Sequence, residues 1–402
     1  MPKVKIGIIV PALTDGGGVP EVARFLFEAA CRAEIVPRVI SLASASMDKF
    51  SVRLSAPGTW FLGVRCGEGE WEGIPFVAVG AMFSELEFQR YLPRKALSEL
   101  LRDCAVIQVV CGSAAWACSA IGIGKPVSVQ VATRVRVERR ARDSAPSGFA
   151  GRWRKAMTPI TDRLERRGLR RAEAVQVENP WMLDFVRNTN AGRELDLRYA
   201  PPGIDAKLFS PLPARDLADP YVLCVGRLDD PRKRVDVLLN AFAQLGPVNA
   251  RLVLAGSSGP TSAFWRNAES LAVRDRVEYV QRPSREALIE LYRNAAVFAL
   301  PSDEEGFGMV LIEAMACGVP VVSTRSGGPD AIVDEGKTGF LVDREDAAAM
   351  TDRLRRLLCD RELNLAMGER ARDAVEHRYT NEVCGRTFVD VWEKLAARGG
   401  TR

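Results

Sequence analysis

Residues 301–320 read Pro-Ser-Asp-Glu-Glu-Gly-Phe-Gly-Met-Val-Leu-Ile-Glu-Ala-Met-Ala-Cys-Gly-Val-Pro. The apolar run Val297–Leu300 precedes this segment and predicts a buried strand, and the apolar residues of Met309–Cys317 predict a helix. Gly318 is expected to end that helix because glycine readily adopts the left-handed conformation at a helix C-terminus. A strand over Pro320–Thr324 follows, so the segment is typical of a parallel α/β sheet.

The Gly-Phe-Gly turn places a helix N-terminus directly after a strand. The backbone amides of Phe307, Gly308 and Met309 would point outward there, which predicts a phosphate-binding site. Glu305 precedes the turn and Glu313 lies one turn inside the helix, so the two carboxylates flank this site from opposite sides. Carboxylates are good acceptors for sugar and ribose hydroxyls.

A second cluster, Val225-Gly-Arg-Leu-Asp-Asp-Pro-Arg-Lys-Arg234, follows the first strand of the C-terminal half. Arg227 and Lys233 are expected at the carboxyl end of that strand, where ligands bind in parallel sheets. Their role would be to neutralise a leaving diphosphate, which a magnesium ion does in other enzymes.

Apolar strands and amphipathic helices alternate along the chain, which predicts two Rossmann-like, doubly wound α/β domains facing a cleft. We expect an N-terminal domain over 1–200, a C-terminal domain over 201–378, and a final helix over 379–402 that packs back on the N-terminal domain. Prolines mark a linker at 200–220. The expected strands are Val4–Val10, Ile35–Leu42, Phe76–Val79, Val106–Val110, Pro126–Val131, Ala174–Val177, Tyr221–Val225, Arg251–Ala255, Val277–Val280, Val297–Leu300 and Pro320–Thr324.

Composition excludes several classes of site. The chain has 402 residues, of which 47% are hydrophobic, enough to bury a core without disulfides or metals. Its nine cysteines include no Cys-x-x-Cys pair, so we expect free thiols in a reducing cytoplasm. The single histidine, His377, rules out histidine-rich metal sites and most catalytic triads.

Two apolar stretches resemble targeting or membrane segments. The apolar run within Met1–Val10 is too short for a signal peptide, so we interpret this segment as a buried strand. Cys104–Gly124 has 21 uncharged residues, long enough to cross a bilayer. It breaks into a strand at Ala105–Cys111, a Gly-Ser turn and a helix of small residues from Ala114, which favours a buried α/β unit.

The net charge of +5 is unevenly distributed. Residues 134–171 hold thirteen Arg or Lys and four Asp or Glu, a local charge of +9. One interpretation is a solvated helical face. The other is contact with anionic lipid headgroups or an acidic acceptor, because clustered basic residues are attracted to anionic surfaces. Nucleic acid is not expected, since no aromatic sheet motif accompanies the charge.

Together these motifs resemble the retaining glycosyltransferases of the GT-B fold, in particular glycosyltransferase family 4. Glu305 and Glu313 match the E-x7-E motif of that family around Gly-Phe-Gly, and Lys233 follows Arg227 by six residues. The resemblance is strong from 221 to 378 and looser over the rest. Further matching segments are Leu-Ala-Gly-Ser at 254–257, Leu-Pro-Ser at 300–302, Ala-Cys-Gly-Val-Pro-Val-Val at 316–322 and Thr-Gly-Phe-Leu-Val at 338–342.

The resemblance implies that the C-terminal domain binds a UDP- or GDP-linked sugar and needs no metal or other cofactor. Glu305 would bind hydroxyls of the donor sugar, and Glu313 would hold the ribose. Arg227 and Lys233 would bind the diphosphate with help from the amides at 307–309, and these two cations with Glu305 would be the catalytic residues. Further donor-binding residues would be Gly256, the strand end Tyr279–Arg282 with Arg282, and, from the N-terminal domain, Gly16–Gly18 with Gly17 and Gly18.

One position departs from the family pattern. Many relatives have a histidine after the strand corresponding to Pro126–Val131, where it contacts the donor sugar, and this chain has Thr133 and Arg134 there instead. Either Thr133 or Arg134 takes over that contact, or the donor lies differently, or activity is reduced. Both residues are predicted on the acceptor side of the site.

The sequence therefore predicts a retaining hexosyltransferase that moves sugar from a nucleotide-sugar donor to a glycan or lipid-linked acceptor in cell-surface polysaccharide biosynthesis. We expect it in the cytoplasm, at the inner face of the membrane if residues 134–171 contact lipid. One alternative is a glycosyltransferase of a soluble small molecule or natural product, in which the basic segment is merely solvated. Another is a nucleotide-sugar-binding protein with weak or no transferase activity, suggested by the missing histidine.

Overall fold

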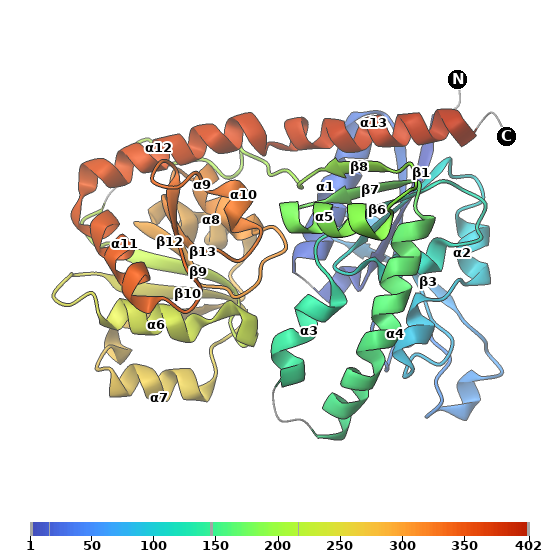
Figure 1. The fold of residues 1–402 in the computed structure, drawn as a ribbon, viewed down its shortest axis with the longest axis horizontal. Coiled ribbons are helices and arrows are strands. Elements are labelled where there is room, and N and C mark those ends of the chain that lie inside the picture. Colours follow the sequence, from blue (N-terminus) through green and yellow to red (C-terminus); the bar gives the residue numbers. More distant parts are fainter. Residues whose placement is uncertain (1–2, 16, 145–147, 216, 400–402) are drawn as a thin grey trace. The chain divides into compact units, whose positions relative to one another are not determined.

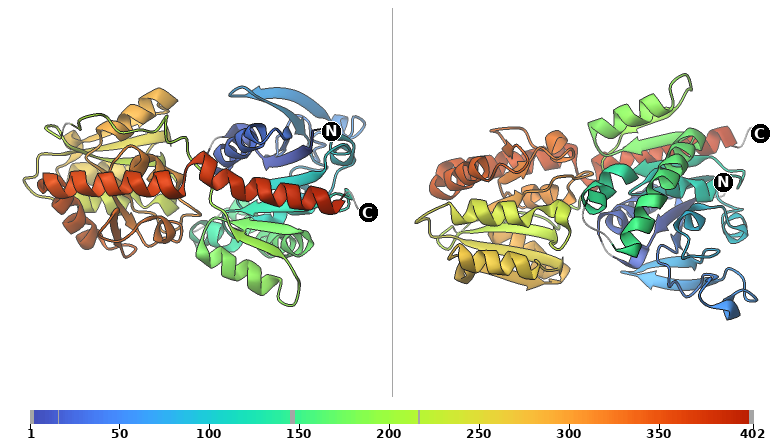
Figure 2. Two further views of the ribbon diagram at one scale, coloured as in Figure 1. Left: turned by 90° about the horizontal axis from the view of Figure 1, so that it is seen from above. Right: turned by 60° about the horizontal axis from the view of Figure 1, so that its bottom comes forward.

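The computed structural model describes residues 3–15, 17–144, 148–215 and 217–399 (Figure 1). The chain forms two compact units, residues 1–203 with 384–402, and residues 204–383. Each unit is a mainly parallel sheet with helices on both of its faces (Figure 2). The predicted pair of Rossmann-like α/β domains is therefore confirmed.

The strands of the first unit are β1 (Lys5–Pro11), β2 (Val36–Leu42), β3 (Cys66–Trp71), β4 (Ile74–Val79), β5 (Val106–Cys111), β6 (Val127–Val131), β7 (Ala174–Val177) and β8 (Asp196–Tyr199). They form one sheet in the order β3-β4-β2-β1-β5-β6-β7-β8, parallel except for the antiparallel pair of β3 and β4. The central strands are mostly apolar and buried along their length because helices cover both faces. The chain order reverses between β1 and β5, the switch point of this sheet.

The helices of the first unit are α1 (Gly18–Arg32), α2 (Lys95–Leu100), α3 (Val135–Ser144), α4 (Phe149–Arg171), α5 (Pro180–Thr189) and, from residue 384 onward, α13 (Asn381–Gly399). Helix α13 packs its apolar face into the core of this unit. Phe388 and Trp392 are fully buried, and Trp392 Nε1 donates a hydrogen bond to Gln108 Oε1 at 2.8 Å. The last helix of the chain therefore completes the core of the first unit.

The strands of the second unit are β9 (Tyr221–Arg227), β10 (Arg251–Ser258), β11 (Val277–Gln281), β12 (Val297–Leu300), β13 (Val321–Thr324) and β14 (Gly339–Val342). All are parallel, in the order β11-β10-β9-β12-β13-β14. The chain runs outward from β9 to β11, then returns to place β12 on the other side of β9. The switch point therefore lies between β9 and β12, and ligands of doubly wound sheets bind at the carboxyl ends of such strands.

The helices of the second unit are α6 (Val235–Ala243), α7 (Ser262–Ser270), α8 (Arg285–Asn294), α9 (Met309–Ala316), α10 (Pro329–Ile332), α11 (Ala347–Cys359) and α12 (Arg361–Arg378). Apolar residues of α6, α7 and α11 pack with strands β9, β10 and β12 in one core cluster. Helix α9 lies between β12 and β13 in the sequence, as its apolar pattern predicts. It ends at Ala316, and Gly318, two residues later, has a φ of 72°.

Four elements of the structure differ from the expectations. The helix expected from Ala114 is a seven-residue 3-10 helix, η4 (Ala114–Ala120), the form that short helical connections often take. Strands β3, β8 and β14 are not among the expected strands, and β3 and β8 lack the apolar runs that mark central strands. All three are edge strands, where one side of the backbone needs no partner strand.

The predicted free cysteines and the uncharged stretch at 104–124 can be placed directly. All nine cysteines are free thiols, and Cys104, Cys111, Cys224 and Cys317 are buried. The uncharged stretch contains β5 and η4. Within the described ranges, no helix is both long and apolar enough to span a membrane.

Candidate functional site

The loop after β9 forms one side of the candidate site in the second unit. Strand β9 ends at Arg227, whose side chain is 54% exposed and lies 3.9 Å from Asp230, measured from Nη2 to Oδ2. Asp230 and Pro231 then start the short helix η5 (Pro231–Lys233). Asp230 Oδ1 accepts a hydrogen bond from the Arg232 amide at 3.1 Å, and proline suits the first helical position. The cap fixes this loop and leaves the Arg227 guanidinium accessible to an anionic ligand.

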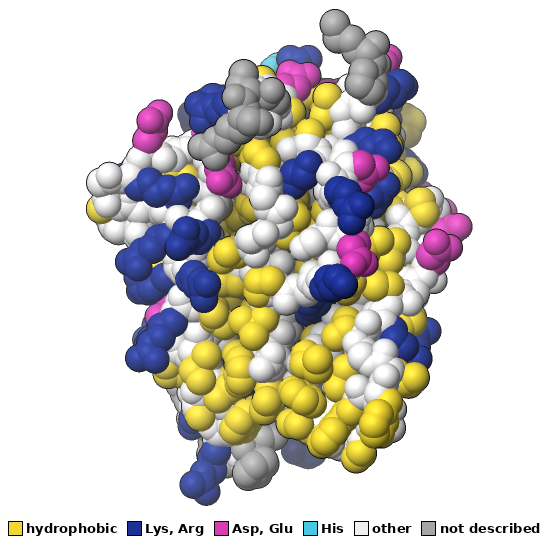
Figure 3. Space-filling model, turned by 90° about the vertical axis from the view of Figure 1, so that its right-hand side faces the viewer, with side chains coloured by type: hydrophobic (Ala, Val, Ile, Leu, Met, Phe, Trp, Pro, Cys, Tyr) yellow, Lys and Arg dark blue, Asp and Glu magenta, His cyan; other side chains and the backbone are white. Residues whose placement is uncertain are grey.

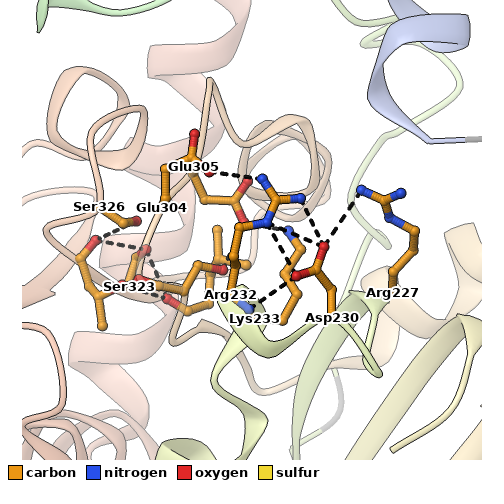
Figure 4. A network of polar contacts seen from close by, with 11 residues as sticks. Arg227, Asp230, Arg232, Lys233, Glu304, Glu305, Ser323 and Ser326 are labelled. Atoms are coloured by element: carbon orange, nitrogen blue, oxygen red, sulfur yellow. Dashed lines mark hydrogen bonds and ion pairs between the residues drawn. The ribbon is translucent and has the colours of Figure 1, made fainter. Parts of the chain in front are cut away.

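Arg232 connects the β9 loop to the loop that follows β12. Figure 4 shows its guanidinium between two carboxylates, at 2.8 Å from Asp230 and 2.8 Å from Glu304. The Arg232 carbonyl also accepts a hydrogen bond from the Asp303 amide at 2.8 Å. Because the planar guanidinium binds both carboxylates, it fixes the position of one loop relative to the other.

Lys233 and Glu305 meet beside this brace (Figure 4). Lys233 Nζ forms an ion pair with Glu305 Oε1, and Ser302 Oγ donates to the same oxygen at 2.7 Å. The side chains are 18% and 11% exposed, so both charges are largely shielded from water. Both contacts use Oε1, and a carboxylate has further lone pairs with which to accept a hydrogen bond from a ligand.

The Gly-Phe-Gly turn is positioned by backbone contacts with the segment after β13. The Glu305 amide donates to the Ser326 carbonyl at 2.9 Å, and the Gly328 amide donates to the Glu305 carbonyl at 3.0 Å. A Cβ atom on Gly328 would lie 2.0 Å from the Phe307 carbonyl oxygen. Only glycine at position 328 therefore allows the two backbone segments to approach this closely.

Helix α9 begins at this turn. Gly308 is its N-cap residue and has a φ of 105° and a ψ of 54°, a left-handed conformation that favours glycine. In the part of the chain that the structure describes, no side chain caps this helix. The first amides of α9 and the helix dipole therefore favour an anionic ligand at this end.

Glu313 lies on α9 and is oriented by Tyr292 of α8. Tyr292 Oη donates a hydrogen bond to Glu313 Oε2 at 2.6 Å. Burial and the neighbouring Glu313 carboxylate raise the pKa of the Tyr292 phenol well above its ordinary value. The phenol therefore remains a hydrogen-bond donor at neutral pH and fixes the direction of the carboxylate.

The carboxyl ends of β10 and β11 form the third part of the site. The Gly256 carbonyl accepts hydrogen bonds from the Arg282 amide at 2.8 Å and from the Tyr279 hydroxyl at 3.0 Å. Arg282 is exposed and has a φ of 45°, a left-handed conformation that is uncommon for a residue with a side chain. Such strained residues gather at ligand sites, so the observation favours a binding role for this strand end.

Residues 210–374 match the family model of the glycosyl transferases group 1. That range contains every residue of the second-unit site described above. This part of the chain is similar to the group 1 glycosyltransferases.

Curated relatives match part of the chain. A Corynebacterium efficiens protein named D-inositol 3-phosphate glycosyltransferase is 40% identical over 215 residues, which cover 49% of this chain and 50% of that protein. The N-acetyl-alpha-D-glucosaminyl L-malate synthase of Bacillus anthracis is 37% identical over 151 residues, 37% of this chain and 39% of that one. The chain spans about half the length, or less, of the curated relatives it matches.

The fold is shared over nearly the whole chain. Sucrose-phosphate synthase from Thermosynechococcus elongatus superposes with a TM-score of 0.75 at 22% identity, over 98% of this chain and 100% of its own. Anabaena HepE in complex with UDP and glucose superposes with a TM-score of 0.72 at 16% identity, over 97% of this chain and 99% of its own. At these identities the likeness shows the GT-B fold alone.

The predicted residues of the second unit gather at the switch point of the sheet. Arg227 ends β9, and Lys233 lies in the loop after it. Glu305 and the amides at 307–309 lie between β12 and the start of α9, and Glu313 lies within α9. Gly256 and Arg282 lie at the adjacent strand ends. Their roles in donor binding and catalysis stay predictions.

Four residues that orient the predicted site residues are missed by the sequence analysis. Arg232 and Asp230 brace the two loops, Ser302 holds Glu305, and Tyr292 holds Glu313. The Asp-Pro pair at 230–231 is a helix-start signal that could have indicated the capping role of Asp230. No local pattern marks Tyr292, because its partner lies 21 residues further along the chain.

The glycines predicted in the first unit lie at the start of α1. Gly17 is the N-cap residue with a φ of 100°, and Gly18 is the first residue of the helix. A Cβ atom at either position would meet nothing within 4 Å, so the backbone is open to a ligand. Gly16 lies outside the described residues. Gly17 and Gly18 as donor contacts stay predictions.

Thr133 and Arg134 follow β6 at the position of the missing histidine. The Thr133 amide donates to the Gly112 carbonyl at 2.9 Å. The Arg134 guanidinium lies 3.0 Å from Asp162 and 3.8 Å above the Phe185 ring, so it is held within the first unit. Arg134 is thus a positioned group rather than a mobile surface charge, and its predicted contact with an acceptor stays a prediction.

Replacing Gly256 with alanine is expected to damage this strand end. The new Cβ atom would lie 1.8 Å from the Gly226 carbonyl oxygen, so β9 and β10 would have to separate. We expect the free energy of unfolding of the second unit to fall by about 1–3 kcal/mol, with weaker nucleotide binding. Urea unfolding and nucleotide titration measure both effects. Gly58→Ala is the control, because its Cβ meets no atom within 4 Å; equal behaviour of the two variants would contradict the prediction.

Proposed function

We propose that this protein is a retaining, metal-independent hexosyltransferase that uses a UDP- or GDP-linked sugar as donor. One observation carries the proposal: two oriented carboxylates flank the start of helix α9, which no side chain caps in the described residues. Glu305 lies before the helix and pairs with Lys233. Glu313 lies within the helix and accepts a hydrogen bond from Tyr292. A diphosphate at this helix start and hydroxyl groups at the two carboxylates match the parts of a nucleotide sugar.

Arg227 and Lys233 are proposed to stabilise the leaving nucleoside diphosphate. Negative charge develops on the phosphate as the bond to the sugar breaks, and fixed cations stabilise that charge without reorganising. Lys233 is fixed by its ion pair with Glu305, and Arg227 is accessible at the end of β9. These charges would do the work of a metal ion. Retention of the anomeric configuration is proposed from the resemblance of the E-x7-E motif.

The proposed acceptor is a glycan or a lipid-linked acceptor in cell-surface polysaccharide biosynthesis. One relative supports a lipid acceptor by its name: the Mycolicibacterium smegmatis GDP-mannose-dependent alpha-(1-6)-phosphatidylinositol monomannoside mannosyltransferase is 37% identical over 195 residues. A soluble small-molecule acceptor is the second candidate. It is favoured by relatives whose names contain D-inositol 3-phosphate and L-malate.

The basic segment 134–171 supports a membrane location for the lipid-linked alternative. It contains α3 and α4, and ion pairs such as Arg134 with Asp162 and Arg139 with Glu87 neutralise part of its charge. Exposed basic residues such as Arg163 and Arg167 on α4 can still attract an anionic surface. We therefore propose a cytoplasmic protein that works at the inner face of the membrane.

The test of the donor proposal is thermal unfolding with UDP, GDP, ADP and dTDP and with their sugar conjugates. A ligand at about 100 times its dissociation constant stabilises the folded state by about 2.7 kcal/mol. Glu313→Gln should weaken binding of the preferred nucleotide by about tenfold, because a hydrogen bond to a charged acceptor is replaced by a neutral one.

Glu369→Gln serves as the matched control, because Glu369 is an exposed residue of α12. It should bind the nucleotide like the wild type. If no nucleotide stabilises the wild-type protein, the donor proposal is wrong. If a nucleotide binds but Glu313→Gln binds it equally well, the role given to Glu313 is wrong.

A further inference from the structure

The first unit exposes large apolar side chains to water. Phe61 is 95% exposed, and its neighbours Trp60 and Leu62 are more than half exposed. Three further exposed apolar residues lie in the same segment or next to it: Met47 and Leu54 within residues 43–65, and Met82 beside Phe83, which packs against Trp60. We define the apolar surface as Met47, Leu54, Trp60, Phe61, Leu62 and Met82. Single exposed apolar residues are common in proteins, but a group of this size marks a contact site.

The segment that carries this surface has a defined structure. Trp60 Nε1 donates to the Arg53 carbonyl at 2.7 Å, and the Trp60 ring packs edge-on against Phe83 at 6.1 Å between centroids. The amides of Leu54 and Ser55 both donate to the Glu85 carboxylate at 3.0 Å. These bonds satisfy backbone groups that would be costly to bring unpaired into an apolar environment. The side chains are therefore presented on an ordered support.

The apolar surface lies at the carboxyl end of the first sheet. Residues 43–65 follow β2, and Met82 follows β4, its parallel neighbour. In parallel α/β sheets this is the end at which ligands bind. An apolar ligand or surface that contacts these residues would therefore lie at the ligand-binding end of the first sheet.

Helix α4 presents a row of basic side chains. Exposed residues recur at intervals of three, four or eight and therefore share one face. Trp153, which is also exposed, lies beside the first of them. The members of this basic row are Arg152, Lys155, Arg163, Arg167 and Arg171.

The short helix η3 (Glu87–Tyr91) connects the apolar surface to the basic helices. Glu87 forms an ion pair with Arg139 of α3 and accepts a hydrogen bond from Thr161 Oγ1 of α4 at 3.1 Å. Phe83 and Glu85, just before η3, contact the apolar segment. Figure 3 shows the resulting face: apolar side chains cover its lower half, basic side chains follow its left edge, and most of the visible acidic ones lie in the upper half.

We propose that the apolar surface docks on a bilayer leaflet that contains anionic lipids, with the basic row of α4 at the headgroups. Trp, Phe and Leu beside Arg and Lys are the composition of proteins that lie in the membrane interface. The proposal deepens the proposed function, because it places the carboxyl end of the first sheet at a membrane from which a lipid-linked acceptor would be drawn.

A second copy of the chain fits this surface less well. A two-fold symmetric contact pairs the same patch on both partners, so it would bring the two basic rows near each other. Like charges at that distance repel, whereas an anionic lipid surface attracts every member of the row. Charge complementarity therefore favours the bilayer.

The test is co-sedimentation of the full chain with phosphatidylcholine vesicles with and without phosphatidylglycerol, at low and high salt. The wild type should bind vesicles that contain phosphatidylglycerol. The double variant Phe61→Ser with Leu62→Ser should bind at least about tenfold more weakly at both salt concentrations, since it removes apolar area. Arg163→Glu with Arg167→Glu should bind more weakly at low salt only, because salt screens charge.

The matched controls change exposed residues of the second unit. Leu271→Ser and the pair Arg266→Glu with Arg361→Glu should bind vesicles like the wild type. The proposal would be overturned if the wild type did not bind anionic vesicles, or if the Phe61→Ser/Leu62→Ser variant bound them as strongly as the wild type. The proposal would also be overturned if light scattering showed that the wild type is a dimer and that the Phe61→Ser/Leu62→Ser variant is a monomer. Stabilisation by a donor nucleotide, measured on the same proteins, tests the proposed function separately.

Discussion

Replacing Lys233 with alanine is expected to lower the turnover of sugar transfer on the order of 10²-fold or more. Lys233 forms an ion pair with Glu305 and is largely shielded from water. A fixed cation in such a place stabilises the charge of a leaving diphosphate more strongly than a solvated one does. Because that charge develops in the transition state, turnover should fall further than the affinity for the intact donor.

A purely structural role of Lys233 would make the variant less stable, whereas the proposed role in turnover would not. With Lys233 removed, Glu305 keeps Ser302 as a partner, so the turn should remain folded. The measurement is steady-state kinetics with the donor identified by thermal unfolding, together with the melting temperature of the variant. Lys337→Ala is the control, because Lys337 is an exposed lysine of the same unit. Turnover equal to that of the control would contradict the assignment.

Replacing Trp392 with alanine is expected to lower the free energy of unfolding of the first unit by about 3–5 kcal/mol. The Trp392 ring is fully buried and packs against Phe388, which in turn packs edge-on against Phe25 of α1. Its removal leaves a cavity and also leaves Gln108 Oε1 without its hydrogen-bond donor. Both losses weaken the attachment of α13 to the sheet.

Two further variants separate these losses. Trp392→Phe keeps most of the packing and removes the donor to Gln108, so it should cost about 1–3 kcal/mol. Glu393→Ala changes an exposed neighbour on α13 and should have little effect. Urea unfolding measures all three, and a bound donor nucleotide identifies the transition of the second unit by shifting it. A Trp392→Ala protein as stable as Glu393→Ala would show that α13 is not part of that core.

The predictability of the fold and the site differs from one element to the next. The pattern of strand, glycine turn and helix at 297–317 is local, so its residues alone indicate the structure and the position of Glu305. Strand β3 is the opposite case, because its sequence of Gly and Glu residues resembles a loop. Its glycines make room for the aromatic rings of Phe50 and Phe76, which lie within 2.2 Å and 2.7 Å of where a Cβ atom would be at Gly67 and Gly69. Only the packed structure shows that requirement.

The sequence by itself determined the class of fold, the strand ends at which the predicted site residues lie, and the positions of the charged residues and glycine turns. These properties depend on apolar periodicity and on backbone freedom, which act over a few neighbouring residues. The tertiary structure alone decided the partners: Lys233 with Glu305, 72 residues apart, and Trp392 with Gln108, 284 residues apart. Such pairs form only when separate strands and helices pack together, and no local pattern encodes their distance.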